Sequence, residues 1–179
     1  VEPDHPLVEW VLQELEDNIF MSKESGYKIP HDEQADTFFD LAGFKLQPNL
    51  LTNMQAHLQR DEIPQFLRVF YNVCWASLYP ETMCFAEWVP RFGEGKGPLY
   101  KTPDECKFVQ YMRYMLILEQ GDDLRLGMGV PRAWMEDGKR VSVKNAVTFF
   151  GIVDIEITSR AAEGSIAGSV KLPVRNRTA

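Results

Sequence analysis

The chain has 179 residues, of which 45% are hydrophobic, 12% aromatic and 25% charged. This is the composition of a globular protein with one domain, or one large and one small domain, and it argues against disordered and fibrous classes. The formal charge is −7 and no dense basic stripe is present, so nucleic acid is not an expected partner. No apolar run reaches the ~18–20 residues of a membrane helix, and Val1–Asp4 lack the features of a signal peptide, so no membrane partner is expected and the compartment stays unknown.

Charge is distributed unevenly along the chain. Residues 1–122 carry 10 basic and 20 acidic side chains, whereas residues 123–179 carry 9 and 6. This shift predicts a boundary between a helical region, 1–122, and a small β region, 123–179. The three cysteines, Cys74, Cys84 and Cys106, have no C-x-x-C spacing, which argues against a disulfide scaffold and a zinc knuckle. We expect buried thiols, no metal site and no cofactor.

Apolar residues at helical spacing predict four helices. The first runs from Pro6 to about Phe20 and the second from about Pro48 to Gln59. A very short connection at Arg60-Asp61 leads into the third, which extends to about Leu78. The fourth opens with the capping box Thr102-Pro103-Asp104-Glu105 and is expected to reach Gln120, before Gly121.

After residue 122 the hydrophobic period changes from near 3.6 to 2, which is typical of strands. Alternating runs occur at 124–128, 141–144, 153–158 and 166–172, separated by turn residues such as Asp137-Gly138 and Glu163-Gly164. Three or four antiparallel strands therefore follow four helices. The predicted fold class is α+β, with two helical hairpins followed by a small antiparallel sheet or sandwich.

Two long connections, residues 21–45 and 80–101, are the main functional signal. If the helices pack as two consecutive hairpins, both connections emerge at the same end of the helices. Long loops without secondary structure are uncommon unless they carry function or lack order. Both are rich in aromatic rings and carboxylates, which are the groups that stack on sugar rings and bind or protonate sugar oxygens.

Four segments together carry a family resemblance. They are the third helix, Cys84–Trp88, Gly97–Glu105 and Leu126–Trp134. They resemble the C-terminal portion of bacterial six-hairpin glycosidase-like proteins, over most of residues 45–160. The resemblance implies an (α/α)₆ toroid with an appended small β-sandwich. A complete toroid has twelve helices, so the four predicted here would form the last third of a catalytic unit.

The carboxylates of the loops are the candidate catalytic groups, since glycoside hydrolysis uses two carboxyl groups, one of which must stay protonated. Glu87 is the preferred acid because Phe85, Ala86, Trp88 and Val89 surround it in sequence. Its partner is Glu33, Glu94 or Asp32, or a residue outside this chain. The alternative for Glu87 is a surface carboxylate paired with Arg91 or Lys96.

Ring-bearing residues of the loops are the candidate substrate-binding groups. Trp88, Phe92 and Tyr100 are expected to form a sugar platform, with His31 and Asp32 as polar contacts. The alternative interpretations are that the rings pack beneath their own loop and that His31 is a solvated loop histidine, since neither His5 nor His57 pairs with it at ligand spacing.

These observations predict a carbohydrate-active protein, the C-terminal portion of a glycoside hydrolase that uses acid/base hydrolysis. Two alternatives remain. In one, the chain binds saccharide without cleaving it. In the other, it is a structural or interaction module whose apolar helical face, with Tyr71 and Trp75, packs against the remainder of a longer chain or a second copy.

Overall fold

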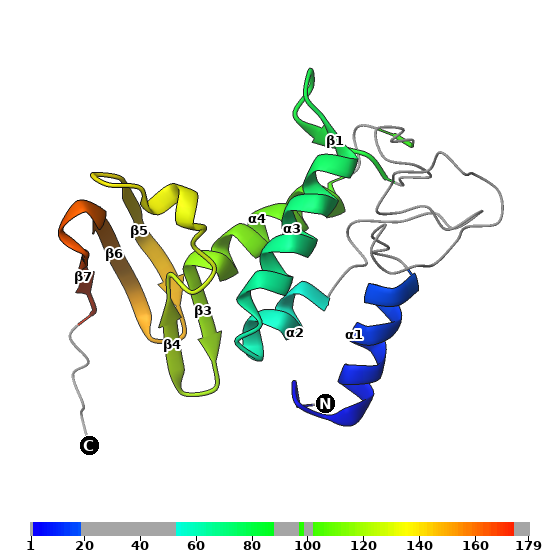
Figure 1. Ribbon diagram of the computed structural model, residues 1–179, viewed down its shortest axis with the longest axis horizontal. Coiled ribbons are helices and arrows are strands. Elements are labelled where there is room, and N and C mark those ends of the chain that lie inside the picture. Colours follow the sequence, from blue (N-terminus) through cyan, green and yellow to red (C-terminus); the bar gives the residue numbers. More distant parts are fainter. Residues whose placement is uncertain (1, 19–52, 88–96, 99–101, 174–179) are drawn as a thin grey trace. The chain divides into compact units, whose positions relative to one another are not determined.

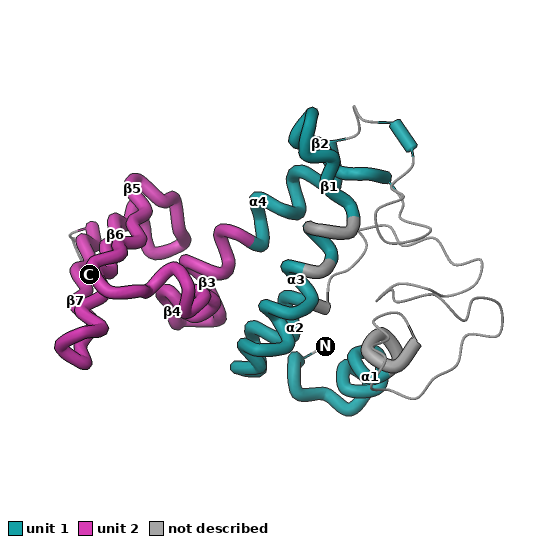
Figure 2. Tube along the Cα trace, turned by 45° about the horizontal axis from the view of Figure 1, so that its top comes forward, with its two compact units in different colours: residues 1–111 teal, residues 112–179 magenta. Residues whose placement is uncertain are grey.

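A computed structural model describes residues 2–18, 53–87, 97–98 and 102–173, and the account below concerns these residues. The fold is α+β, with four α-helices and small antiparallel sheets (Figure 1). No ring of helices is evident in this part of the chain. The chain forms two compact units, residues 1–111 and 112–179 (Figure 2). Residue 122, the boundary predicted from charge, lies in a β-turn of the second unit.

The first unit contains α1 (Pro6–Asn18), α2 (Asn53–Gln59), α3 (Ile63–Ser77), the strands β1 (Leu78–Tyr79) and β2 (Cys84–Phe85), and the first part of α4 (Pro103–Leu116). Its core lies along α3, where Phe66, Val69, Phe70 and Val73 recur at helical spacing and are all buried. The Phe70 ring stacks on Phe66 and on Phe108 of α4, with ring centroids 5.9 and 5.7 Å apart. These contacts hold α3 and the start of α4 together.

A tight turn joins α2 to α3, as the sequence predicts. The Asp61 N–H donates to the Leu58 carbonyl at 3.2 Å, and the Glu62 N–H donates to the His57 carbonyl at 2.8 Å. This is the Schellman arrangement, which usually places glycine at the residue with positive φ. Here Asp61 occupies that position with a φ of 62°. The left-handed conformation of Asp61 is therefore sterically unfavourable compared with glycine at the same position.

The end of the fourth helix differs from the prediction. α4 stops at Leu116, and Ile117–Gln120 forms β3, which pairs antiparallel with β4 (Asp123–Leu126). The Leu116 and Met115 carbonyls at the helix end accept the Gly127 and Gly129 N–H groups at 2.8 and 3.0 Å, so tertiary partners replace the next helical turn. The apolar pattern across Gly121 was consistent with either structure.

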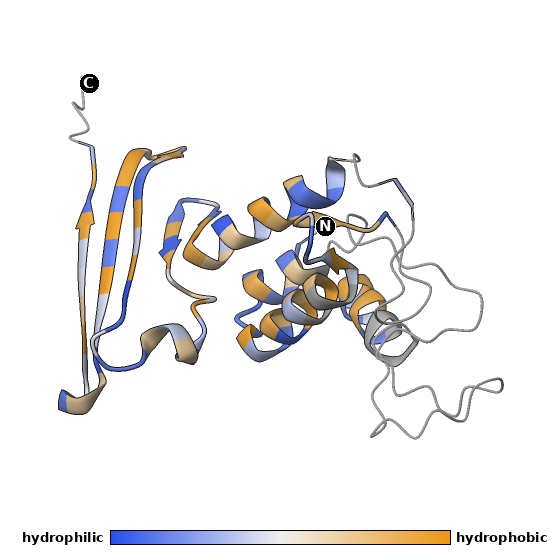
Figure 3. Cartoon of the chain, turned by 90° about the horizontal axis from the view of Figure 1, so that it is seen from above, coloured by the Kyte–Doolittle hydropathy of each residue, from blue (hydrophilic) through white to orange (hydrophobic). Residues whose placement is uncertain are grey.

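The second unit is built on a three-stranded antiparallel sheet in the order β5-β6-β7. β5 spans Arg140–Thr148, β6 Gly151–Arg160 and β7 Ser165–Lys171, with short 3₁₀ helices η3 (Arg132–Met135) and η4 (Ala161–Glu163) beside them. Hydrophobic and hydrophilic residues alternate along β6 (Figure 3). One face of the sheet packs against the β3–β4 hairpin through a core of buried residues: Ile117, Ala146, Val153 and Ile155.

A bulge interrupts the pairing of β5 with β6 between Val143 and Ala146. Asn145 adopts a φ of 56° there, and its N–H donates to Asp154 Oδ1 at 2.7 Å. Val143 and Ala146 are three positions apart, which in a regular strand would place them on opposite faces, and the bulge keeps both on the covered face. The predicted strand at 141–144 is therefore the first half of a longer one.

Candidate functional site

Of the eight candidate site residues, Glu87 lies in the part of the chain that the structure describes. The other seven lie outside the described residues, so their placement stays a prediction: His31, Asp32, Glu33, Trp88, Phe92, Glu94 and Tyr100. The same holds for the prediction that both long connections share one end of the helices. The site is therefore built from Glu87 and its surroundings.

A short hairpin that sequence reasoning assigned to a loop positions Glu87. Leu78 pairs with Phe85 and Tyr79 with Cys84. Beyond this pairing, the Ala86 N–H donates to the Ser77 carbonyl at 2.7 Å, at the end of α3. Phe85 and Ala86 are buried, whereas Glu87 is half-buried. Glu87 therefore directly follows a buried segment, Phe85-Ala86, whose Ala86 N–H is hydrogen-bonded to the end of α3.

Glu105 supports the same segment from α4. Its Oε1 accepts the Phe85 N–H at 3.0 Å. The capping box had assigned this carboxylate to the backbone at Thr102. The Thr102 carbonyl does accept the Cys106 N–H at 3.0 Å, as the start of a helix requires, but Glu105 bonds to the strand instead. The side chain therefore ties β2 to α4 rather than capping its own helix.

Gly97 lies directly against Glu87. A Cβ atom added at Gly97 would lie 2.5 Å from the Glu87 Cβ and 2.9 Å from its Oε2, and Gly97 has a φ of +103°. Both facts require glycine at this position. The segment 88–96 is therefore flanked by two described residues, Glu87 and Gly97, that lie against each other. Loops whose ends meet in this way are frequently functional.

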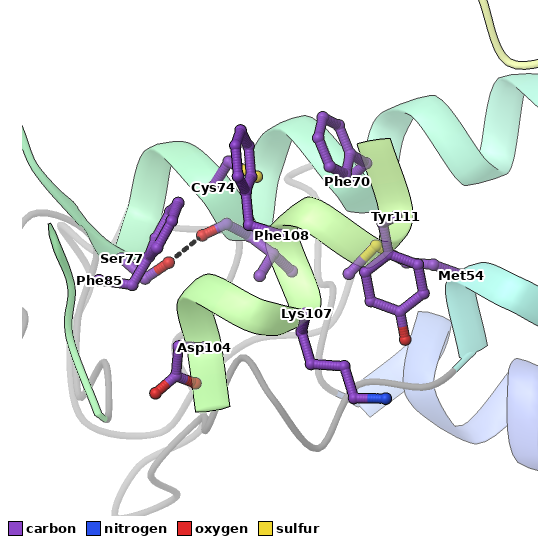
Figure 4. A pocket seen from close by; sticks show the side chains of 10 residues that line it. Met54, Phe70, Cys74, Ser77, Phe85, Asp104, Lys107, Phe108 and Tyr111 are labelled. Carbon is purple, nitrogen blue, oxygen red and sulfur yellow. Dashed lines mark hydrogen bonds between the residues drawn. The ribbon is translucent and has the colours of Figure 1, made fainter. Parts of the chain in front are cut away.

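A separate cavity in the first unit is too small for a sugar. It holds about 20 Å³, which is room for about one water molecule. Figure 4 shows that aromatic and sulfur-containing side chains surround it, with Asp104 and Lys107 of α4 at its margin. The residues that line it come from α2, α3, β2 and α4: Met54, Phe70, Val73, Cys74, Ser77, Phe85, Asp104, Lys107, Phe108 and Tyr111. We interpret it as a packing defect of the core.

Two residues that line this cavity, Cys74 and Ser77, are of types that can act as nucleophiles, but the surroundings of neither activate it. Burial raises the pKa of the Cys74 thiol to about 12, so the reactive thiolate is scarce at neutral pH. The buried Ser77 hydroxyl donates to the Val73 carbonyl four residues earlier in α3. All three cysteines are free, as expected, but the expectation that they are buried is wrong, because Cys74 and Cys84 are half-buried and Cys106 is exposed. Neither Cys74 nor Ser77 has the arrangement of an activated nucleophile.

Sequence reasoning missed a charged cluster at the α2–α3 turn. His57 Nδ1 lies 2.7 Å from Glu62 Oε2, and Arg60 Nε donates to Glu62 Oε1, also at 2.7 Å. Arg60 Nη2 donates to Glu9 of α1. The hydrogen bond to Glu9 is the main cause of a raised Arg60 pKa. The buried His57 imidazole is remote from solvent, so we interpret the cluster as a structural link between α1 and the turn.

Other classes of site find no support in the described ranges. These residues contain no group of three or more His, Cys, Asp or Glu side chains that could hold a metal ion. Among them there is also no helix with the length and hydropathy to cross a membrane. Comparison with protein-family models, with curated proteins and with solved structures finds no match. The functional argument therefore depends on the chemistry around Glu87.

Proposed function

We propose that this chain is carbohydrate-active and forms the C-terminal portion of a glycoside hydrolase, with Glu87 as the general acid. The observation that supports this is the contact between Gly97 and the half-buried Glu87, the two described residues that flank the segment 88–96. Two aromatic residues, Trp88 and Phe92, and a second carboxylate, Glu94, belong to this segment. In sequence, each of them lies within seven residues of Glu87. Rings for stacking and paired carboxyls are the groups that glycosidic hydrolysis requires.

In this proposal Glu87 donates a proton to the glycosidic oxygen as the bond to the sugar breaks. The residues directly before Glu87, Phe85 and Ala86, are buried. Glu94 is the proposed second carboxylate, with Glu33 as the other candidate. The separation of the two carboxyls, about 5–5.5 Å or 6.5–9.5 Å, decides between retention and inversion. Tyr100, His31 and Asp32 are proposed to contact the substrate.

The proposed larger architecture is an (α/α)₆ toroid to which α1–α4 contribute two hairpins. The β5–β7 sheet would then be the appended β domain. The reading frame upstream of Val1 tests this directly: eight further helices at hairpin spacing support the toroid. An upstream frame without such helices, or a translation start immediately before Val1, contradicts it.

Saccharide binding and turnover are best measured separately. Binding of a panel of oligosaccharides is followed by calorimetry for the parent, Trp88→Ala and Glu87→Gln. Turnover is followed by release of reducing ends in the longest natural chain that contains these residues. Glu81→Gln is the matched control, because Glu81 is exposed in the β1–β2 turn.

The proposal expects three results. Glu87→Gln loses turnover by about 10²-fold or more, the scale of a lost general acid, and keeps binding. Trp88→Ala weakens binding, and Glu81→Gln changes neither property. Binding without turnover in the parent supports the alternative of a non-catalytic saccharide-binding module. A parent that neither binds nor cleaves any saccharide contradicts both.

One observation favours an interaction module as a second candidate function. Leu7, Trp10 and Val11 lie at helical spacing on α1 and are all more than half exposed. A contiguous apolar stripe of this kind is typical of a docking helix. We propose the remainder of a longer chain as its occupant. Tyr71 of the predicted face is half-buried, and the side chain of Trp75 is not among those the structure describes.

Substitution of Trp10, the most exposed residue of the stripe, tests this second candidate function. Hydrophobic-dye binding by residues 1–179 alone should be strong and should fall in Trp10→Glu. It should also fall when the longer chain is used, because the stripe is then covered. Equal dye binding by the short and long chains contradicts an occupant from the same polypeptide.

A further inference from the structure

The third strand of the sheet, β7, is exposed along its whole length, although it continues a face that is buried on β6. Val170 is paired with Ile155 and Ile166 with Ser159. Residues that are directly opposite in an antiparallel pair point to the same side of the sheet. Yet Val170 and Ile166 are 49% and 65% exposed, whereas Ile155 and Ser159 are 3% and 2% exposed. The apolar face therefore extends beyond its cover.

The elements that cover the apolar face of the sheet reach β5 and β6 but not β7. Residues of the α4 end and of the β3–β4 hairpin pack on the core of β5 and β6: Leu116, Ile117, Leu124 and Leu126. After β4 the chain lies close to β6 at Gly127, where an added Cβ would be 2.7 Å from Ile157 Cδ1. Nothing in the described part of this unit covers Ile166 or Val170. Leu172, just after the strand, is also more than half exposed.

The outer edge of β7 is also open. The strand order β5-β6-β7 leaves that edge without a pairing strand among the described residues. Native sheets commonly protect an edge with charges, proline or a bulge. From Ser165 to Val170 the sequence is Ser-Ile-Ala-Gly-Ser-Val, without charge or proline, and its register with β6 runs without a bulge. This edge is open to strand addition.

We propose that a second copy of this chain adds to β7, antiparallel and across a two-fold axis at Gly168. This register pairs all seven residues of both strands and gives a six-stranded sheet. It places Ile166 opposite Val170 of the other copy, so the exposed apolar residues form one surface. The interface lies within residues 112–179 and is independent of the saccharide proposal.

Charge favours this orientation and this partner. Lys171 is the one charged residue of β7. In the antiparallel pairing Lys171, whose Nζ lies 3.9 Å from Asp154 Oδ2 of β6, faces the uncharged Ser165 of the second copy. A parallel pairing would set Lys171 against Lys171, which is unfavourable. The antiparallel pairing therefore brings no like charges together and sets the apolar Ile166 and Val170 of the two copies opposite each other, which favours a second copy as the added strand.

The oligomeric state of the full 179-residue chain tests the proposal. Sedimentation equilibrium at protein concentrations up to about 100 μM covers the range of micromolar dissociation constants. We expect a monomer–dimer equilibrium in the parent. Val170→Lys introduces a charge on the apolar side of the edge and should weaken the dimer at least tenfold. Val147→Lys is the matched control, since Val147 is exposed on β5 and faces the other side of the sheet, and it should leave the equilibrium unchanged.

A cross-link tests the register without depending on a destabilising charge. Gly168→Cys places two thiols opposite each other at the two-fold axis, in a Cys106→Ser background that removes the exposed native thiol. The substitution is tolerated locally, because an added Cβ at Gly168 meets only the Glu156 carbonyl oxygen at 3.8 Å. Mild oxidation should give a disulfide-linked dimer on a non-reducing gel. Ser142→Cys, exposed on β5, should give none.

Two outcomes overturn the proposal. One is a parent that stays monomeric over the whole concentration range. The other is a dimer that Val170→Lys leaves intact and in which Gly168→Cys cross-links no faster than Ser142→Cys. Because no sugar is present in either measurement, failure here is distinguishable from failure of the saccharide proposal.

Discussion

The helix α3 and the strand β7 both carry an apolar side, but only α3 has it covered. Phe66, Phe70 and Val73 of α3 are packed against α2 and α4 and are almost fully buried. Val170 of β7 shares a face with buried residues of β6 and remains half exposed. Apolar periodicity therefore indicates which residues can form a core, whereas burial depends on whether another element reaches them.

Thiol reactivity should show the largest contrast between the α3 core and exposed positions. A pKa of about 12 for Cys74, against an ordinary value of 9.0, lowers the thiolate fraction at neutral pH by roughly a thousandfold. We expect Cys106 to react with a disulfide reagent at about pH 8 within the mixing time scale of the assay, and Cys74 only on unfolding. Mass spectrometry of the labelled chain identifies the site.

The same pKa shift fixes the sign of a stability effect. Below pH 9 the Cys74 thiol is protonated in both folded and unfolded chains. Above that pH the unfolded chain ionises first, so this residue's contribution to stability is lost progressively between pH 9 and about 12. Cys74→Ala should flatten the alkaline decline in denaturation midpoint. An identical decline in both proteins contradicts the assignment of a buried protonated thiol.

Truncation of a core aromatic residue should cause the largest loss of stability among the single substitutions. Phe66→Ala removes a completely buried ring that stacks on Phe70, and we expect a loss of about 3–5 kcal/mol in the free energy of unfolding. Phe149→Ala is the control, because Phe149 is 90% exposed in the β5–β6 turn, and it should change stability by less than about 0.5 kcal/mol. Urea denaturation measures both. Equal losses would mean that the α3 core is poorly packed.

Two valines on the same face of the sheet, one buried and one half exposed, allow the stability cost of truncation to be compared within the second unit. Val153→Ala on β6 removes two methyl groups from a fully buried site and should cost about 2 kcal/mol. Val170→Ala on β7 should cost less than about 0.5 kcal/mol in a dilute monomer. If denaturation is repeated at high protein concentration, the cost at Val170 should rise, because the proposed second copy then covers it.

Two turns should give the smallest effects, of opposite sign. Asp61, in the turn after α2, and Gly164, after η4, both have positive φ, at 62° and 68°. Asp61→Gly should stabilise the chain by about 0.5–1 kcal/mol because glycine adopts this conformation without steric cost. Gly164→Ala should destabilise it by about 1 kcal/mol. Thermal denaturation of the two variants checks the signs, and a destabilising Asp61→Gly would show that the aspartate side chain contributes more than its backbone strain costs.

Helical periodicity was sufficient to predict much of the fold. The starts of α1 and α4 and the tight turn before α3 agree with the structure because each has a local signal, namely Pro6, Pro103 and the short Arg60-Asp61 connection. The strands β4, β6 and β7 were predicted to within a few residues from the alternation of apolar and polar residues, and β5 was predicted in its first half. Local chemistry determines where an element begins when proline or a capping residue fixes the backbone.

The errors occur where tertiary contacts decide the structure. Ile117–Gln120 continues the apolar pattern of α4, yet it forms β3, which pairs with β4 and places Ile117 in the core on β5 and β6. β1 and β2 were missed because two-residue strands have no measurable period. The Glu9–Arg60 pair joins residues 51 positions apart, a separation that no local motif can reveal. At the candidate site, the sequence indicated Glu87, but it gave no sign that Gly97 folds back against it.

The contact between Gly97 and Glu87 places the two residues that flank positions 88–96 next to each other. A loop whose two flanking residues are in contact can be shortened, lengthened or exchanged without changing the spacing of the helices and strands on either side. Binding specificity could then diversify at this position while α3, β2 and α4 keep their arrangement. Grafting a foreign peptide between these two residues would use the protein as a display scaffold.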